Sequence, residues 1–308
     1  MEGSFERVTR EKPCAICGRN SWCIRLNRYH LCMRIESEKP GENGGWYHTK
    51  DAKAVLLPLP PRKRRVSDEE LRDRWTPIAE QSAKNGIDKL AELSVKLRVS
   101  INALVKLGVG YSENLHGVAC WTFPERNSRG WIIGITRRLV APRNGVDKLF
   151  CKGSRRGLTY CEDWASYHGP VYLVEGASDV AAGLTMGLCV IGRPTCTGGI
   201  AHLVEMLAGY RKRRIVVVGE RDRKSDLYIQ QSKNHDPKCT ACQVCWPGRY
   251  GMERTAKALR HKLNRKIAMG FPPEPAKDLR SWFAASGVEP RQIKQCVMLN
   301  SEWKRLVG

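Results

Sequence analysis

The chain has 308 residues and a net charge of +22, from 53 lysines and arginines against 31 aspartates and glutamates. A charge of that size favours a polyanionic partner, above all nucleic acid, over an ordinary highly charged soluble protein. We find neither the roughly 18 uninterrupted apolar residues of a spanning helix nor a secretory signal in residues 1–12, so we expect a cytoplasmic protein with no membrane partner.

Four of the 13 cysteines lie in the first 32 residues, in the run PCAICGRNSWCIRLNRYHLC. They are Cys14, Cys17, Cys23 and Cys32. A C-x2-C pair followed by Gly18 suits a tight turn, and the second pair then completes a tetrahedral structural zinc site. His30 is an alternative ligand, and scattered buried cysteines are the alternative to a metal site. We expect a zinc-binding domain over residues 1–50 that is too small to fold without metal.

A second cluster lies in the run KNHDPKCTACQVC, where three closely spaced cysteines follow a histidine. Its members are His235, Cys239, Cys242 and Cys245. The spacing is compatible with a second zinc ion, although three cysteines so close in sequence need a further partner to complete the site. The alternative is a surface loop that carries cysteines.

Residues 51–75 predict an extended basic linker, because prolines precede four consecutive basic residues at 62–65. Helical spacing of apolar residues extends from 68 to 108, with Ser100 as a suitable N-cap. The strand-like runs VACWTF, GWIIGITRRLV and DKLFCKG follow. We interpret residues 76–170 as an α+β subdomain whose basic side chains bind nucleic-acid and nucleotide phosphates, with solvated charge as the alternative. These side chains are Arg137, Arg138, Lys148, Lys152, Arg155 and Arg156.

From residue 171 onward, apolar strands alternate with helices: VYLV, LCVIG, IVVV and KIAMG are each followed by a helical pattern. This alternation predicts a parallel sheet with helices on both faces, and ligands bind such sheets at the carboxyl ends of the strands. The expected fold class is therefore α/β, with a small zinc module, an α+β basic subdomain and a parallel-sheet domain with flanking helices.

Acidic residues follow the strands at the expected carboxyl edge of this sheet. They are Glu175, Glu220, Asp222 and, in a later loop, Asp278. Carboxylates that meet in this way are typical ligands of Mg²⁺, and two such ions can stabilise an in-line phosphoryl displacement. The alternative is a set of solvated acids at ordinary loop ends.

The run VYLVEGASDVAAGLTMG, followed by IVVVGERD and AKDLRSWF, resembles the TOPRIM domain of bacterial-type, DnaG-like DNA primases. The order of the motifs resembles such a primase, of phage or mobile-element type, over most of residues 14–285. In that family a strand-end glutamate and a later Asp-x-Asp motif organise the catalytic Mg²⁺ ions. Glu175 matches the glutamate, Asp222 the second aspartate, and Asp278 a further acid.

The resemblance implies a TOPRIM domain over residues 171–288 and a C-terminal helix over 289–308. Two features depart from the family pattern. Glu220 stands where the first aspartate of the motif is expected, and a cysteine-rich insertion at 223–250 separates Asp222 from the next helix. Both bear on activity more than on fold, because near-octahedral Mg²⁺ is sensitive to ligand placement.

The implied function is that of a DNA primase, which makes short RNA primers on single-stranded DNA from ribonucleoside triphosphates by metal-assisted nucleotidyl transfer. The Mg²⁺ or Mn²⁺ ligands would be Glu175, Glu220 and Asp222, with Asp278 in support. The zinc module would hold the template, with Trp22, Arg28 or Tyr29 stacking on bases. No G-x-x-x-x-G-K-[ST] loop occurs, so a helicase or replication initiator would be a separate partner. The alternatives are a TOPRIM nuclease and a non-catalytic single-stranded DNA-binding accessory protein.

Overall fold

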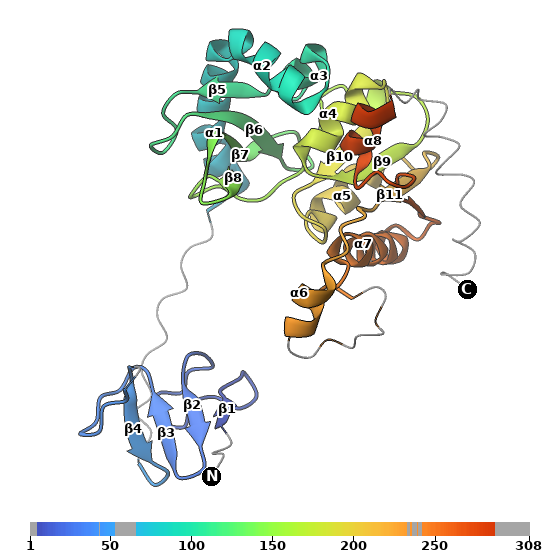
Figure 1. Ribbon diagram of the computed structural model, residues 1–308. Helices are drawn as coiled ribbons and strands as arrows, with labels where there is room; N and C mark the ends of the chain where they lie inside the picture. Colours follow the sequence, from blue (N-terminus) through green and yellow to red (C-terminus); the bar gives the residue numbers. More distant parts are fainter. Residues whose placement is uncertain are drawn as a thin grey trace. The chain divides into compact units, whose positions relative to one another are not determined.

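The computed structural model divides the chain into two units, Met1–Arg65 and Val66–Gly308. It describes residues 5–42, 44–52, 66–232, 235, 239 and 242–286 (Figure 1). The basic run at 62–65 and the C-terminal helix expected over 289–308 lie outside these residues. Among the helices of the described ranges, none is long and apolar enough to cross a membrane.

The first unit is built on a four-stranded antiparallel sheet with strand order β1-β2-β3-β4. Its strands are β1 (Phe5–Arg7), β2 (Ile24–Leu26), β3 (Tyr29–Cys32) and β4 (Trp46–Thr49). The buried cluster of this unit contains Val8, Ile16 and four cysteines. A core with so few aliphatic side chains stabilises little by itself, so the small sheet needs an additional cross-link such as a metal ion.

The second unit begins with three helices: α1 (Asp68–Asn85), α2 (Ile87–Leu97) and α3 (Ile101–Lys106). Helix α1 begins inside the range assigned to the linker, because Ser67 and Glu70 form a capping box at its N-terminus. Ser100 caps α3 as predicted, by accepting a hydrogen bond from the Ala103 backbone N–H. The helical pattern expected over 68–108 is thus confirmed.

An antiparallel sheet with strand order β5-β6-β7-β8 follows these helices. Its strands are β5 (Gly110–Ser112), β6 (Cys120–Arg126), β7 (Ile132–Arg143) and β8 (Val146–Phe150). Leu71 and Trp75 of α1 belong to one buried cluster with Ile133 of β7. One face of the sheet is therefore covered by α1, and the side chains that alternate with that cluster point to the other face. A short 3-10 helix (Trp164–Ser166) precedes the next sheet.

The predicted parallel sheet is confirmed, with strand order β10-β9-β11-β12 and parallel pairing throughout. Its strands are β9 (Val171–Glu175), β10 (Cys189–Arg193), β11 (Ile215–Val218) and β12 (Ala268–Gly270). The helices are α4 (Ala177–Thr185), α5 (Ile200–Leu207), α6 (Asp226–Gln231), α7 (Pro247–Leu263) and α8 (Leu279–Ser286). Figure 1 shows α4 with α8 on one side of the sheet and α5 with α7 on the other.

Several hydrogen bonds join the part of the second unit that holds the antiparallel sheet to the part that holds the parallel sheet. Thr159 forms an antiparallel bridge with Gly192 of β10, and the Ser100 backbone N–H donates to the hydroxyl of Thr185 on α4 at 2.9 Å. One hydrophobic core includes residues of both parts, from Leu90 on α2 to Leu279 on α8. The β6-β7-β8 sheet is therefore held in a fixed position beside the carboxyl ends of β9 and β10.

Candidate active site and metal centres

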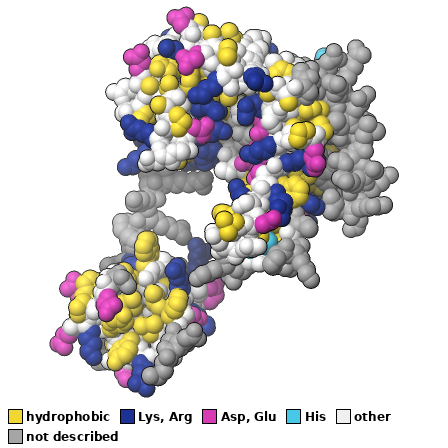
Figure 2. Space-filling view, viewed as in Figure 1, with side chains coloured by type: hydrophobic (Ala, Val, Ile, Leu, Met, Phe, Trp, Pro, Cys, Tyr) yellow, Lys and Arg dark blue, Asp and Glu magenta, His cyan; other side chains and the backbone are white. Residues whose placement is uncertain are grey.

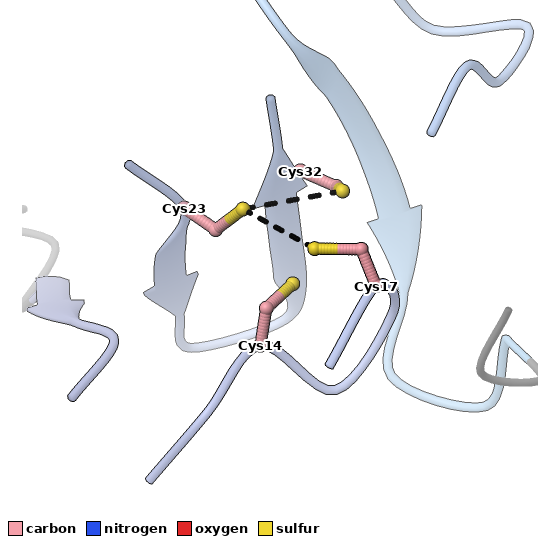
Figure 3. Close-up of side chains that lie close together, drawn as sticks. All are labelled: Cys14, Cys17, Cys23 and Cys32. Atoms are coloured by element: carbon pink, nitrogen blue, oxygen red, sulfur yellow. Dashed lines mark hydrogen bonds between the residues drawn. The ribbon is translucent and has the colours of Figure 1, made fainter. Parts of the chain in front are cut away.

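Four cysteines of the first unit converge on one point (Figure 3). Their sulfur atoms lie within 4.8 Å of one another and all four side chains are buried. They are Cys14, Cys17, Cys23 and Cys32. The Cys17–Cys23 and Cys23–Cys32 sulfur separations are 3.8 and 4.0 Å, close to the edge of about 3.8 Å in a tetrahedron with zinc–sulfur bonds of about 2.3 Å. This four-cysteine group fits a structural zinc ion.

Backbone groups next to the four-cysteine group also suit bound thiolates. The backbone N–H groups of Met33 and Ile35 point at the sulfur atoms of Cys23 and Cys32, at 3.5 and 3.4 Å. Such donors stabilise metal-bound thiolates and fix their orientation. His30 lies on β3 opposite His48 of β4, and the four cysteines complete a tetrahedral set without it.

The second cysteine cluster also converges, with its histidine included. We call its members the histidine–cysteine group: His235, Cys239, Cys242 and Cys245, whose ligand atoms lie within 4.8 Å of one another. Both ring nitrogens of His235 are buried and have no hydrogen-bond partner among the described residues, and the backbone N–H of Cys245 lowers the pKa of Cys242 to about 6. Unpartnered imidazole nitrogen and readily ionised thiol are suitable donors for zinc, so this group fits a second structural ion.

A cavity of about 490 Å³ lies at the carboxyl edge of the parallel sheet. Its walls come from strands β6, β7 and β8 on one side and from the ends of β9, β10 and β11 on the other. The lining residues include four acids at the strand ends and beside them: Glu175, Asp179, Glu220 and Asp278. Three cations from the antiparallel sheet and the segment after it also line it: Arg138, Lys148 and Arg156. We call the parallel-sheet side the acidic wall and the antiparallel-sheet side the basic wall. The acidic wall also includes Arg193, Lys277 and Arg280, and the basic wall also includes Glu125 and Asp147.

Glu175 and Glu220 repel each other's negative charge in a buried setting. Burial raises the pKa of Glu220 to about 7, with further contributions from Glu175, Asp278 and Asp222, while Lys277 opposes the rise. Burial also raises the pKa of Glu175, against the effect of Arg193 on the neighbouring strand. Lys277 lies 3.6 Å from a carboxylate oxygen of Glu220. Carboxylates crowded in this way are suited to a divalent cation, whose charge would remove the repulsion.

Asp222 and Asp278 are placed at this edge by helix capping. The carboxylate of Asp222 accepts a hydrogen bond from the Gly248 backbone N–H in the first turn of α7, at 2.8 Å. That of Asp278 accepts one from the Ser281 backbone N–H at 2.7 Å, at the start of α8. The Arg221 backbone N–H donates to the carbonyl oxygen of Lys277 at 2.7 Å. The two acidic segments are therefore joined directly.

Asp179 is an acidic side chain that the sequence patterns did not single out. It lies in the first turn of α4, is only 3% exposed, and accepts a hydrogen bond from the Arg280 backbone N–H at 3.2 Å. Burial, together with the charges of Asp278 and Glu220, raises its pKa well above the usual range. Its position four residues after Glu175 was the available signal, because a strand that leads straight into a helix brings the first helical turn to the strand end. We call Glu175, Asp179, Glu220, Asp222 and Asp278 the acidic edge.

The six basic residues selected from the sequence do not lie together. Arg138, Lys148 and Arg156 line the cavity. Arg137 is buried and donates to the carbonyl oxygen of Leu115 at 2.7 Å, because successive residues of β7 face opposite sides of the sheet. Arg155 is paired with Asp68 at the start of α1, and Lys152 is exposed on the surface. Figure 2 shows lysine and arginine side chains gathered near the middle of the visible face of the second unit, with acidic side chains among them.

Arg156 is held by a network that no sequence pattern indicated. Its guanidinium lies 3.0 Å from the buried carboxylate of Glu125 and 4.6 Å from the centre of the Phe150 ring. Glu125 also accepts hydrogen bonds from the Thr136 hydroxyl at 2.6 Å and the Gly157 backbone N–H at 2.8 Å. The planar Arg156 side chain is thus fixed on two sides before any ligand binds.

The fold of the second unit can be compared with that of solved structures. No family model matches the chain, and no curated protein sequence matches it. Among solved structures, the Escherichia coli primase catalytic core aligns with 76% of this chain and 80% of its own, at a TM-score of 0.51 and 14% identity. A DnaG primase catalytic domain bound to single-stranded DNA aligns with 77% of this chain and 83% of its own, at 0.51 and 14%.

A DNA primase domain from Pseudomonas aeruginosa aligns with 73% of this chain and 78% of its own, at a TM-score of 0.50 and 15% identity. At these identities the likeness establishes the fold. The chain has the fold of DnaG-type primase catalytic cores, so the resemblance seen in the sequence is confirmed at that level. The assignment to a phage or mobile element stays a prediction.

Proposed function

We propose that the chain is a DNA primase, which synthesises short RNA primers on single-stranded DNA by template-directed nucleotidyl transfer. The observation that carries the proposal is the cavity with an acidic wall and a basic wall, formed within the fold of primase catalytic cores. One of the solved structures with this fold is a primase catalytic domain bound to single-stranded DNA. In this proposal the zinc-binding domain is residues 1–50, and the polymerase core comprises the basic subdomain at 76–170 and the TOPRIM domain at 171–288.

The acidic edge is suited to hold Mg²⁺ or Mn²⁺ through Glu175, Glu220 and Asp222, with Asp278 in support. Bound divalent ions would stabilise charge on the attacking and leaving oxygens of a phosphoryl transfer. The protein's contribution is to bring these half-buried carboxylates to one edge of the sheet, where burial raises the pKa of Glu220 to about 7. Lys277 offsets part of their repulsion when no ion is bound. Glu220 reaches this edge from the loop after β11, so the longer side chain still lies among the acids of the cavity.

The basic wall is suited to bind the phosphates of a ribonucleoside triphosphate and of the template. Arg156 presents a guanidinium that Glu125 and the carbonyl oxygen of Pro194 hold in place, and its remaining N–H groups can donate to a phosphate. Arg138 is paired with Asp147 at 3.1 Å, and Lys148 lies next to that aspartate on β8. A phosphate that enters the cavity would compete with Asp147 for Arg138. The three cations therefore differ in how freely they can bind a ligand.

The zinc module would contact the template. Trp22 is 79% exposed, between Cys17 and Cys23, and Tyr29 is 37% exposed. A flat exposed side chain on a rigid metal-bound turn can stack on an unpaired base, and Arg28 can add a phosphate contact. A separate helicase or initiator would supply single-stranded template, and the protein would act on replicating DNA in the cytoplasm.

Primer synthesis on single-stranded DNA tests the proposal. The wild-type chain, incubated with single-stranded DNA, labelled ribonucleotides and Mg²⁺ or Mn²⁺, is expected to make short RNA products. Glu175→Gln should lower product formation by roughly 100-fold or more, because it removes a charged metal ligand. Glu92→Gln, an exposed acid on α2, is the matched control. Tight DNA binding without any product would contradict the proposal in favour of a binding protein, and DNA cleavage would favour a nuclease.

A further inference from the structure

The insertion between Asp222 and α7 ends against the acidic edge. Cys245 of the histidine–cysteine group is followed directly by Trp246 and by Pro247, the first residue of α7. The Lys224 backbone N–H donates to the carbonyl oxygen of Cys245 at 2.8 Å, so the first and last parts of the insertion are joined. The histidine–cysteine group therefore lies directly before α7, where the insertion ends.

Two hydrogen bonds connect the start of α7 to the loop after β11 that carries Glu220 and Asp222. The indole N–H of Trp246 donates to the carbonyl oxygen of Glu220 at 3.1 Å. The backbone N–H of Gly248 donates to the carboxylate of Asp222 at 2.8 Å. Both acids are among the residues proposed to hold the divalent ions. The residues just after Cys245 thus contact the backbone of one of these acids and the side chain of the other.

The approach is too close for any residue larger than glycine at position 248. A Cβ at Gly248 would lie 2.7 Å from the carbonyl oxygen of Glu220 and 2.8 Å from a carboxylate oxygen of Asp222. The Trp246 ring is held in turn by Phe271, with ring centres 6.1 Å apart, and by the Arg249 guanidinium at 5.4 Å. The start of α7 fits tightly onto the loop, and a small displacement of it would move Asp222.

The part of the insertion before Trp246 has only a small core. Among its described residues, Ile229 and Cys245 are the buried apolar side chains, while Leu227 and Tyr228 are 65% and 52% exposed. Helix α6 is only six residues long. A segment with so small a core gains most of its order from a cross-link, and the converging side chains of the histidine–cysteine group can supply one through zinc.

We propose that zinc bound by the histidine–cysteine group positions the acidic edge, by holding Trp246 and Gly248 against Glu220 and Asp222. The four ligands are thus positioning residues that act through the start of α7 on the divalent-ion site. The proposal rests on the proposed function to the extent that the acidic edge binds Mg²⁺ or Mn²⁺. It assigns the insertion a role inside the same unit rather than a separate binding function.

The test is the Mn²⁺ affinity of the full chain, measured by electron paramagnetic resonance of free Mn²⁺, together with zinc content. Cys242→Ser should lower zinc from two ions per chain to one and weaken Mn²⁺ binding by about tenfold, the lower end of the effect of groups that orient metal ligands. Trp246→Phe should keep both zinc ions and weaken Mn²⁺ binding severalfold, because it removes only the N–H donor to Glu220. This second variant keeps the test decisive if Cys242→Ser disorders the insertion.

Two controls separate this effect from general damage. Cys14→Ser should also lose one zinc ion, from the other group, but keep wild-type Mn²⁺ affinity. Leu227→Ala, at an exposed site of the same insertion, should keep both zinc ions and the Mn²⁺ affinity. Unchanged Mn²⁺ affinity in Cys242→Ser and Trp246→Phe would overturn this inference alone, as would two zinc ions in Cys242→Ser. A wild-type chain that binds no Mn²⁺ would overturn the proposed function, and the inference with it.

Discussion

At the scale of single residues, the cavity depends on which face of a strand each side chain occupies. Arg137 and Arg138 are adjacent in sequence, yet Arg138 lines the cavity and Arg137 is buried on the opposite side of β7. Strand periodicity alone predicts that two successive arginines cannot share a face. It does not say which of them faces a ligand, because that depends on where α1 packs.

Glu125 could not be selected from the sequence for a related reason. Its partner Arg156 lies 31 positions later in the chain, and an antiparallel bridge between Arg126 of β6 and Leu158 brings the two segments together. The strand-end acids were easier to find, because the carboxyl ends of parallel strands must meet at one edge. Asp179 and Arg193 required knowledge of how α4 and β10 pack, which local patterns do not contain.

Arg156→Ala tests the basic wall. Loss of the guanidinium should raise the KM for ribonucleotides by about tenfold, the loss expected for one charge-assisted contact of about 1.5 kcal/mol. Steady-state primer synthesis at varied nucleotide concentration measures it. Lys84→Ala, an exposed lysine on α1, should behave as wild type. An unaltered KM in Arg156→Ala would show that the nucleotide binds elsewhere.

The titration of Glu220 predicts how the stability of the second unit depends on pH without divalent ions. Its pKa is about 7 in the folded chain against an ordinary value of 4.5, so the folded state holds the proton more tightly. The stabilisation is complete below pH 4.5 and is lost as the pH rises toward 7, with a loss on the order of 3 kcal/mol. Urea unfolding at pH 5 and 7.5, in buffer free of Mg²⁺ and Mn²⁺, measures this change.

Glu220→Gln should remove the part of this pH dependence that Glu220 contributes, since an amide does not titrate, while Glu175 and Asp179, whose pKa values are also raised, keep theirs. Mn²⁺ should oppose the loss in the wild type, because it binds the ionised carboxylates. An equal decrease in unfolding free energy for the wild type and Glu220→Gln would mean that other groups cause it.

At the scale of elements, the parallel sheet was the most predictable part of the structure. Each of its apolar strands is followed by a helix, and no other common arrangement buries both faces of such strands. The boundaries were less predictable: α7 begins at Pro247, inside the range 223–250 assigned to the insertion. The helical start there depends on Asp222, which caps Gly248 from the far end of the insertion. Pro247 at the first helical position is a local signal of this start, but a cap supplied from 26 residues away in sequence leaves none.

Helix α4 packs so closely on β10 that position 183 has room only for glycine. A Cβ at this position would lie 2.3 Å from a methyl group of Val190 on β10. Gly183→Ala should therefore lower the free energy of unfolding by about 1–3 kcal/mol, even though alanine is the better helix former. Gly209→Ala is the matched control, because its Cβ would meet no atom within 4 Å. Chemical denaturation of both variants measures the difference, and equal stabilities would contradict this packing argument.

At the scale of the whole molecule, the net charge of +22 combines two opposite local fields. The acidic edge lies within a chain that is otherwise strongly basic, and the cavity brings Glu175 and Glu220 within one space with Arg138 and Arg156. Such an arrangement attracts a polyanion and a divalent cation to the same place. Composition alone could not show this separation, because it records only the sum.

A salt titration of DNA binding should distinguish the basic residues that bind DNA from the acidic edge. Binding of single-stranded DNA should weaken at least tenfold between about 50 and 200 mM salt, because lysines and arginines release the counterions of the phosphates. Arg138→Ala, if Arg138 contacts the template, should lower the slope of log K against log salt by about 1. Glu175→Gln should leave that slope unchanged while it abolishes primer synthesis. Fluorescence anisotropy of labelled DNA measures the slopes, and a changed slope in Glu175→Gln would show that DNA binding and chemistry share the acidic edge.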